Sequence, residues 1–107
     1  MKIAIDFDDV LHNPKVVKPG YKMGTPIPGA KEALTLLKKQ GHEIIIFPVW
    51  ADTQERRKAI TDWLKYFEIP FDDITSVKPD ADIFLDDKAV RFTLWAEVLD
   101  FVSKLST

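Results

Sequence analysis

The sequence predicts a single α/β domain over residues 1–107, with a three-layer, Rossmann-like fold and a parallel central sheet. Three short apolar runs, at residues 2–6, 43–47 and 82–86, have the composition of buried strands. Patterns of helical period lie between and after them. Strands that alternate with helices in this way are typical of a parallel sheet covered on both faces. A chain of 107 residues suits one domain and leaves no room for a second.

The expected strands and the first loop follow from local composition. In the first strand, at residues 2–6, an apolar run leads directly into acidic residues. The stretch 11–27 is rich in proline, glycine and lysine, which favours a loop or a small hairpin over one edge of the domain. The run EIIIF, at 43–47, is β-branched without interruption, as in strands that are buried on both faces. The run DIFLD, at 82–86, predicts the third strand.

Three helices are expected from the spacing of apolar residues. The first begins near Pro28 and stops at Gly41. The second spans 53–67, with Thr53 as its N-cap. The third spans 93–105 and closes the pattern. The apolar stripes of the three helices are Ala30, Ala33, Leu34 and Leu37, then Ile60, Trp63, Leu64 and Phe67, then Leu94, Val98, Phe101 and Leu105.

Composition and charge argue against several classes of function. A net charge of −2 creates no field that would hold nucleic acid without sequence preference. The chain has no cysteine, which excludes disulfides and thiolate metal sites. No apolar stretch approaches the ~20 residues of a membrane span, and too few apolar residues precede Asp6 for a signal peptide. We therefore expect a cytoplasmic protein with no membrane partner.

Acidic residues gather at the expected carboxyl ends of two strands. Asp6, Asp8 and Asp9 follow the first strand, and Asp86 with Asp87 closes the third. The carboxyl ends of parallel strands form the ligand crevice of such sheets, so two remote segments send acids to one edge. Two like charges ~4 Å apart repel by roughly 4 kcal/mol at an effective dielectric near 20, so the acids share protons, point apart or bind a cation. Oxygen ligands favour Mg²⁺.

Other polar residues have simpler interpretations. A single acid at a strand end usually caps a helix or forms a turn, and only the two clusters together favour a metal site. His12 and His42 stand alone in the sequence, and we expect a solvent-facing or structural role for each. Asp72 and Asp73 follow the second helix, which should return the chain to the opposite edge of the sheet. They are expected to form a turn.

The two acidic clusters also carry a resemblance to a known family. IDFDDVL resembles the first signature of the haloacid dehalogenase (HAD) superfamily of phosphotransferases, an Asp-x-Asp pair that ends a buried strand. IFLDD resembles its last signature, and VKPDADIFLDD resembles the Lys-Pro segment that precedes it in small cap-less members. The resemblance covers nearly the whole chain in the right order. It implies a HAD-like fold without a cap domain and Mg²⁺-dependent hydrolysis of a phosphate monoester.

Matched position by position, the resemblance implies a role for each motif residue. Asp6 would be the nucleophile that forms an aspartyl-phosphate. Asp8 would protonate the leaving oxygen and then activate water. Mg²⁺ would be held by the Asp6 side chain, the Asp8 backbone carbonyl and Asp86, with Asp87 bound directly or through water. Lys78 matches the third motif, which would stabilise charge on the nucleophile and the phosphate.

The middle of the chain departs from the family pattern. The second motif has a Ser or Thr where this chain has Pro48, which offers neither a hydroxyl nor a backbone N–H. Seven residues separate Lys78 from Asp86, and about four of them are expected strand residues that span roughly 13 Å. Lys78 would then lie near the wrong edge of the sheet unless the loop folds back, so Lys88 is the reserve candidate for the catalytic lysine. Two functions therefore stay open: a phosphatase, and a catalytically weak or inactive HAD-fold binding module.

Further alternatives concern the reaction and the partners. A bacterial receiver domain is disfavoured, because its phosphoacceptor Asp ends a middle strand and Phe47 and Pro48 stand there. Transfer of the phosphoryl group to an acceptor other than water stays open. A site without a cap fits a large substrate or a partner subunit that covers it, which leaves room for a homo-oligomer. Lys15, Lys18 and Lys22 either meet an anion or are simply solvated.

Overall fold

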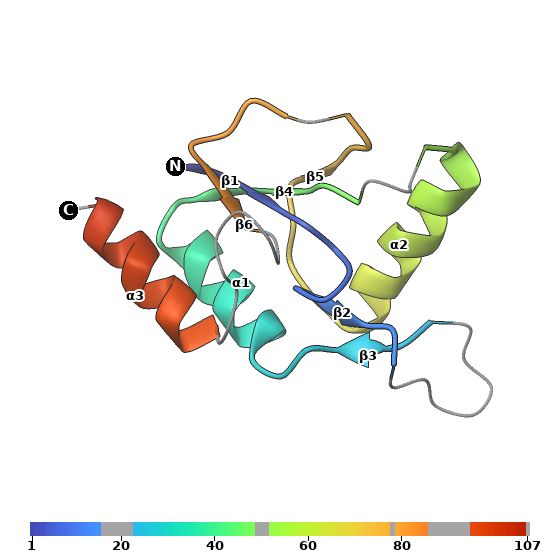
Figure 1. Ribbon diagram of the computed structural model, residues 1–107, viewed down its shortest axis with the longest axis horizontal. Coiled ribbons are helices and arrows are strands. Elements are labelled where there is room, and N and C mark those ends of the chain that lie inside the picture. Colours follow the sequence, from blue (N-terminus) through green and yellow to red (C-terminus); the bar gives the residue numbers. More distant parts are fainter. Residues whose placement is uncertain (16–22, 49–51, 78, 86–94, 107) are drawn as a thin grey trace.

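The chain folds into a mixed α/β domain in which helices flank a parallel sheet (Figure 1). The computed structural model describes residues 1–15, 23–48, 52–77, 79–85 and 95–106. This architecture is compatible with a three-layer Rossmann-like fold, and the predicted fold class is confirmed. Within the described segments, none of the helices is both long enough and apolar enough to cross a membrane.

The sheet has four parallel strands in the order β5-β4-β1-β6. They are β1 (Lys2–Ile5), β4 (Glu43–Ile46), β5 (Asp73–Ile74) and β6 (Ile83–Leu85). Three of them lie in the runs that the sequence predicts as strands. β1 is an inner strand of the sheet, with β4 on one side and β6 on the other. The residue that follows β1 therefore lies between neighbouring strands, at the end of the sheet where the parallel strands finish.

A second, two-stranded sheet lies in the stretch for which a loop or small hairpin is expected. Its strands β2 (His12–Asn13) and β3 (Thr25–Pro26) pair antiparallel. Residues 16–22, which connect them in the sequence, lie outside the described residues. The backbone N–H of Ile27 donates to Leu11 (2.8 Å), so the pairing extends past the strands. The hairpin alternative is therefore confirmed.

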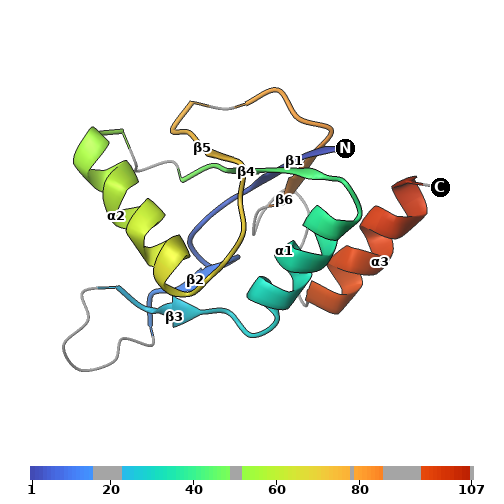
Figure 2. The same ribbon diagram turned by 180° about the vertical axis from the view of Figure 1, so that it is seen from behind.

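The described residues also form three helices: α1 (Ala30–Lys39), α2 (Gln54–Tyr66) and α3 (Trp95–Ser106). Gly41 has a φ of 89°, which glycine adopts without strain, and it follows the end of α1 as predicted. The Thr53 side chain accepts the backbone N–H three residues later (3.2 Å) and caps α2. Helices α1 and α3 lie side by side in both views (Figures 1 and 2).

The core forms between the sheet and the helices. Along β1, Ile3, Ala4 and Ile5 are all at most 1% exposed, although successive strand side chains point to opposite faces. The isoleucines of β4 are at most 6% exposed, so the prediction that this strand is buried on both faces is confirmed. The main hydrophobic cluster combines the strands with side chains from all three helices. Its large members outside the sheet are Phe7, Leu11, Leu34, Leu37, Ile60, Trp63, Leu64, Ile69 and Trp95.

His42 has a structural role, which was one of the two alternatives expected for it. Its side chain is buried, and Nδ1 accepts a hydrogen bond from the amino group of Met1 (2.9 Å). Burial, followed by the positive charge of that amino group, lowers the pKa of His42 below its ordinary value. The neutral ring is therefore the form that the fold favours.

The pair of acids after α2 corrects one detail of the prediction. Asp73 opens the edge strand β5 and does not form a turn, because its backbone pairs with β4. Asp72 accepts the backbone N–H of Ile44 (2.7 Å) and pairs with the ammonium group of Lys38 (2.6 Å). Since Ile44 lies near the start of β4, Asp72 sits away from the edge that carries Asp6, as expected. A two-residue strand is too short to produce a recognisable apolar run.

We expect Asp72→Asn to lower the free energy of unfolding by about 1–2 kcal/mol. The change removes the charge that holds Lys38 and weakens the acceptor for the Ile44 N–H; the range allows for the one-third exposure of both side chains. Burial alone would raise the pKa of Asp72, but the Ile44 N–H and the Lys38 ammonium outweigh it and lower that pKa. The stabilisation is therefore complete above about pH 4 and is lost as the pH falls through the folded-state pKa. Urea unfolding at several pH values measures both effects.

Asp62→Asn is the matched control for this experiment. Asp62 pairs with Lys58 on the exposed surface of α2 (2.7 Å), where an ion pair of this kind contributes only a few tenths of a kcal/mol. If both variants lost the same stability, Asp72 would act only as a surface charge.

Candidate active site

Asp6 leaves the sheet between two neighbouring strands. Its backbone N–H donates to Leu85 of β6 (2.9 Å), and the N–H of Phe47, just after β4, donates to Ile5 (2.8 Å). The backbone on both sides of Asp6 is thus fixed by the sheet. Asp6 lies at the carboxyl edge of an inner strand, where parallel sheets bind their ligands.

A tight turn follows Asp6 and brings the chain back toward the sheet edge. The N–H groups of Leu11 and His12 both donate to the carbonyl of Phe7 (2.9 Å each), and the N–H of Asp9 donates to His12 (2.8 Å). Asp9 has a φ of 64°, in the left-handed region that aspartate tolerates better than most residues. Phe7, Val10 and Leu11 are fully buried. The apolar residues of this segment therefore anchor the turn that carries the acids.

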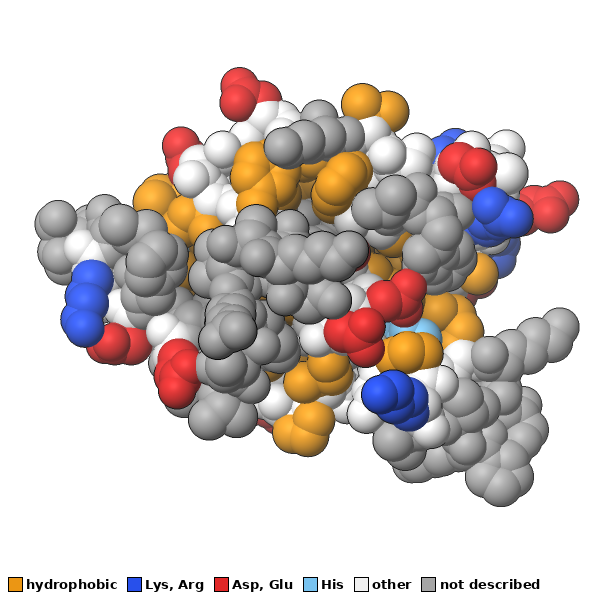
Figure 3. All heavy atoms as spheres, in the orientation of Figure 1, with side chains coloured by type: hydrophobic (Ala, Val, Ile, Leu, Met, Phe, Trp, Pro, Cys, Tyr) orange, Lys and Arg blue, Asp and Glu red, His pale blue; other side chains and the backbone are white. Residues whose placement is uncertain are grey.

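The two acids at the ends of the Asp-x-Asp pair have defined partners. The Asp6 Oδ1 atom accepts the N–H of Phe7 (2.8 Å). The Asp8 Oδ1 atom lies 2.7 Å from Nδ1 of His12, and the Asp8 side chain is 36% exposed. In the space-filling view of Figure 3, acidic side chains lie against a histidine and hydrophobic side chains. The Asp8 carboxylate is thus held by His12 and remains partly accessible to solvent.

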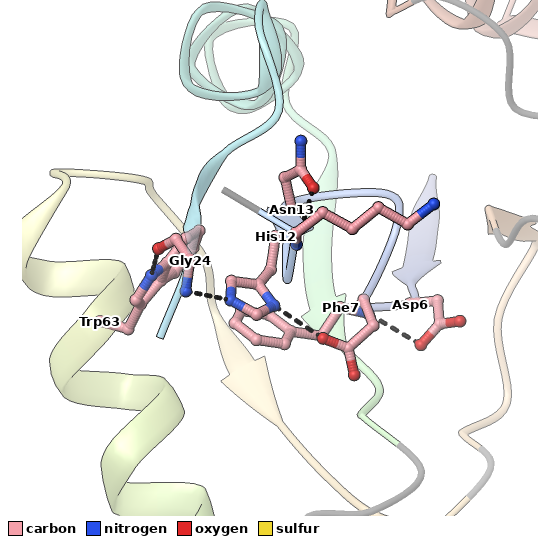
Figure 4. A network of polar contacts seen from close by, with 8 residues as sticks. Asp6, Phe7, His12, Asn13, Gly24 and Trp63 are labelled. Atoms are coloured by element: carbon pink, nitrogen blue, oxygen red, sulfur yellow. Dashed lines mark hydrogen bonds and ion pairs between the residues drawn. The ribbon is translucent and has the colours of Figure 1, made fainter. Parts of the chain in front are cut away.

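His12 is the residue of this site that sequence reasoning missed. It is buried, its Nε2 accepts the backbone N–H of Gly24 (2.7 Å), and its ring stacks on Phe7 with centroids 4.9 Å apart. The indole N–H of Trp63 donates to the carbonyl of Gly24 (2.9 Å), which closes a network that Figure 4 shows. His12 follows Asp8 by four residues, and this spacing was the available signal. The structural alternative expected for His12 is confirmed, with a specific partner.

The other predicted residues of the site lie outside the described residues. Leu85, the last residue of β6, lies opposite Ile5 in the register of the sheet, and Asp86 follows it in the sequence. Among the described residues there is no group of three or more side chains that could hold a metal ion. Two of the four predicted ligands, Asp86 and Asp87, lie outside those residues. The predicted residues not described are Lys78, Lys88, Asp86 and Asp87, with Lys18 and Lys22 of the early loop.

Pro48 lies two residues past the end of β4, whose last residue is paired with Ile5 of β1. It is buried, and the preceding N–H, that of Phe47, is used in the sheet ladder with Ile5. Proline has no N–H of its own, so position 48 offers no hydrogen-bond donor at this edge. Lys15 of the early loop is exposed.

Comparisons with known proteins show the fold and give no activity. No protein-family model matches the chain, and no curated protein matches it. The structure of a conserved protein from Bacteroides thetaiotaomicron is 26% identical with a TM-score of 0.77, and the match covers 100% of this chain and 93% of that one. The crystal structure of a target protein from Vibrio cholerae is 22% identical with a TM-score of 0.61, covering 99% and 98% of the two chains. The chain therefore resembles, over nearly its full length, a fold that these two bacterial proteins share.

Proposed function

We propose that the protein is a Mg²⁺-dependent phosphatase of HAD type that hydrolyses a phosphate monoester through an aspartyl-phosphate on Asp6. The observation that carries the proposal is the position of the Asp-x-Asp pair. Asp6 extends from the carboxyl edge of β1, and Asp8 follows on a turn whose apolar residues are buried. The strand that runs beside β1 on one side, β6, is followed in the sequence by Asp86 and Asp87.

The proposed reaction has two displacement steps at phosphorus. In the first, a carboxylate oxygen of Asp6 bonds to phosphorus while the bond to the substrate oxygen breaks, and Asp8 gives that oxygen a proton. In the second, Asp8 takes a proton from water as the water oxygen bonds to phosphorus. The bond between phosphorus and Asp6 then breaks, which releases inorganic phosphate and restores the carboxylate. A solvent-accessible Asp8 suits both proton transfers.

The donor set fits Mg²⁺, because it consists of oxygen atoms alone. The proposed ligands are the Asp6 side chain, the Asp8 backbone carbonyl and Asp86, with Asp87 bound directly or through water. When bound, the ion offsets the negative charge that the acids and a phosphate dianion bring together. Lys78, or Lys88 in its place, is proposed to stabilise the same charge.

Hydrolysis of an aryl phosphate and a panel of phosphate monoesters tests the proposal, with Mg²⁺ and with excess EDTA. Calorimetry of Mg²⁺ binding is measured in parallel. Turnover that requires Mg²⁺ supports the phosphatase. Mg²⁺ binding without turnover on the whole panel supports the alternative, a HAD-fold binding module, which the buried Pro48 favours. Phosphorylated product in place of free phosphate supports transfer to another acceptor.

Pro48→Ser is expected to raise the Mg²⁺-dependent kcat by about 10-fold or more. The change supplies a hydroxyl and a backbone N–H at the sheet edge, and one transition-state donor contributes on the order of 10²–10³ in rate. Steady-state kinetics on the aryl phosphate measure the effect. Pro48→Ala is the matched control, because it restores only the backbone N–H. A kcat that is equal in the serine and alanine variants would exclude a role for the hydroxyl.

The partners of the protein and its cellular location remain predictions. In its described part, the connection between β1 and β4 contains only the small hairpin and α1, and this open edge suits a large substrate or a second subunit. Light scattering with and without Mg²⁺ distinguishes a monomer from a homo-oligomer. The proposed substrate is a small-molecule or polymer-borne phosphate monoester in the cytoplasm.

A further inference from the structure

His12 is held on both of its ring nitrogens. Nδ1 lies 2.7 Å from Oδ1 of Asp8, and Nε2 lies 2.7 Å from the backbone nitrogen of Gly24. The His12 side chain is 7% exposed, whereas that of Asp8 is 36% exposed. A buried ring therefore joins a solvent-accessible carboxylate to the backbone of the hairpin.

The direction of these hydrogen bonds follows from chemistry. A backbone N–H can only donate, so Nε2 of His12 must present its lone pair to Gly24. In a neutral imidazole the proton then resides on Nδ1, from which it is donated to Asp8. Because Nε2 is closed by Gly24, the ring has no second site at which to pass on a proton. His12 is thus a donor of fixed orientation and not a proton relay.

The surroundings of the ring prevent it from turning. Phe7 stacks on one face with an interplanar angle of 10°, and Trp63 meets the ring edge-on, with centroids 5.4 Å apart. Trp63 also holds the carbonyl of Gly24. Position 24 has no room for a larger residue, because an added Cβ would lie 1.8 Å from the carbonyl oxygen of Asn13. Each group that fixes His12 is itself fixed.

We propose that His12 is a positioning residue for Asp8, and that its Nδ1–H selects the carboxylate orientation in which Asp8 meets the leaving group. The inference rests on the proposed function, in which Asp8 is the acid and base. An aspartate side chain can adopt several staggered rotamers, and the backbone of the turn does not by itself remove this freedom. The hydrogen bond from a locked ring removes that freedom before substrate binds.

Two substitutions separate positioning from structural support. In His12→Asn the side-chain nitrogen is attached at Cγ, like Nδ1, so it can still donate to Asp8 but leaves the N–H of Gly24 without an acceptor. In His12→Gln the amide reaches the place of Nε2, so it can accept from Gly24 but can no longer donate to Asp8. The two variants each remove a different half of the His12 contacts.

The two His12 variants are expected to rank in opposite order by kcat and by stability. His12→Gln should lower kcat by about 10- to 100-fold with little change in KM, and His12→Asn should stay within about threefold of wild type. In urea unfolding, His12→Asn should be the less stable variant, because the group it leaves unpaired is buried. A kcat that follows the stability order would overturn the proposal and leave His12 a purely structural residue.

Crystal structures of the two variants provide a readout that does not depend on turnover. Asp8 should keep its side-chain orientation in His12→Asn and adopt another in His12→Gln; an unchanged Asp8 in both would refute positioning. If the wild-type protein has no phosphatase activity, the proposed function fails, and the crystallographic comparison still decides whether His12 orients Asp8. If wild-type activity is present and both variants match it, only the role of His12 fails.

Discussion

Asp6→Asn is expected to abolish the Mg²⁺-dependent phosphatase activity, with a fall in kcat of about 10⁴-fold or more. The amide that replaces the carboxylate is neutral and a poor nucleophile, so no covalent bond to phosphorus forms. It also replaces a charged carboxylate, a proposed ligand of Mg²⁺, with a neutral amide oxygen. Phosphate release from the aryl phosphate measures the loss, and rapid acid quenching with labelled substrate tests for the covalent intermediate in the wild type.

Asp9→Asn is the matched control for the nucleophile. It makes the same chemical change three residues away, on an exposed side chain that has no role in the proposed reaction. Asparagine tolerates the left-handed backbone of this position, where φ is 64°, so the turn is retained. We expect kcat within about threefold of wild type. Substantial turnover in Asp6→Asn, or an equal loss in both variants, would rule out Asp6 as the nucleophile.

Trp63→Ala is expected to lower the free energy of unfolding by about 3–5 kcal/mol, a large share of the roughly 5–15 kcal/mol typical of a domain. The indole is 6% exposed and packs against Phe7, His12 and Phe67 with ring centroids 5.0–5.4 Å apart. Its removal leaves a cavity and an unpaired carbonyl at Gly24. Urea unfolding followed by circular dichroism measures the change.

Trp63→Phe separates the two contributions of the indole. It retains most of the packing and removes the N–H that holds Gly24, so a smaller loss of about 1–2 kcal/mol is expected. Equal stability of wild type and Trp63→Ala would mean that α2 is not anchored through this residue. Because Trp63 also contacts His12, both variants should lower kcat at temperatures at which the protein remains folded.

The sheet could be predicted from sequence wherever a strand is long and apolar. The runs at 2–6, 43–47 and 82–86 each contain a strand, because the residues at the centre of each run are uninterrupted apolar residues and the charged residues stand only at the ends. The edge strand β5 was missed, since Asp73–Ile74 has neither the length nor the alternation that marks a strand. Its place depends on backbone pairing with β4, which is a tertiary contact.

The candidate site was predicted in part. Asp6 and Asp8 could be chosen because acids that follow a buried strand are conspicuous, and the structure places Asp6 at the carboxyl edge of β1. The hydrogen bond between His12 and Asp8 was harder to predict from the sequence. It depends on the turn at Asp9 and on Gly24, which directly precedes the far strand of the hairpin, so contacts from three segments fix one ring. The pattern of charged residues in the sequence does not by itself predict such a contact.

The clamp of His12, Gly24 and Trp63 at the base of the hairpin has an evolutionary consequence. Two chain segments that are fastened at their base can accept a connection of changed length or composition, because loop length alters the closure entropy only slowly. Sequence changes between Lys15 and Met23 should therefore leave the contacts that hold His12 beside Asp8 in place.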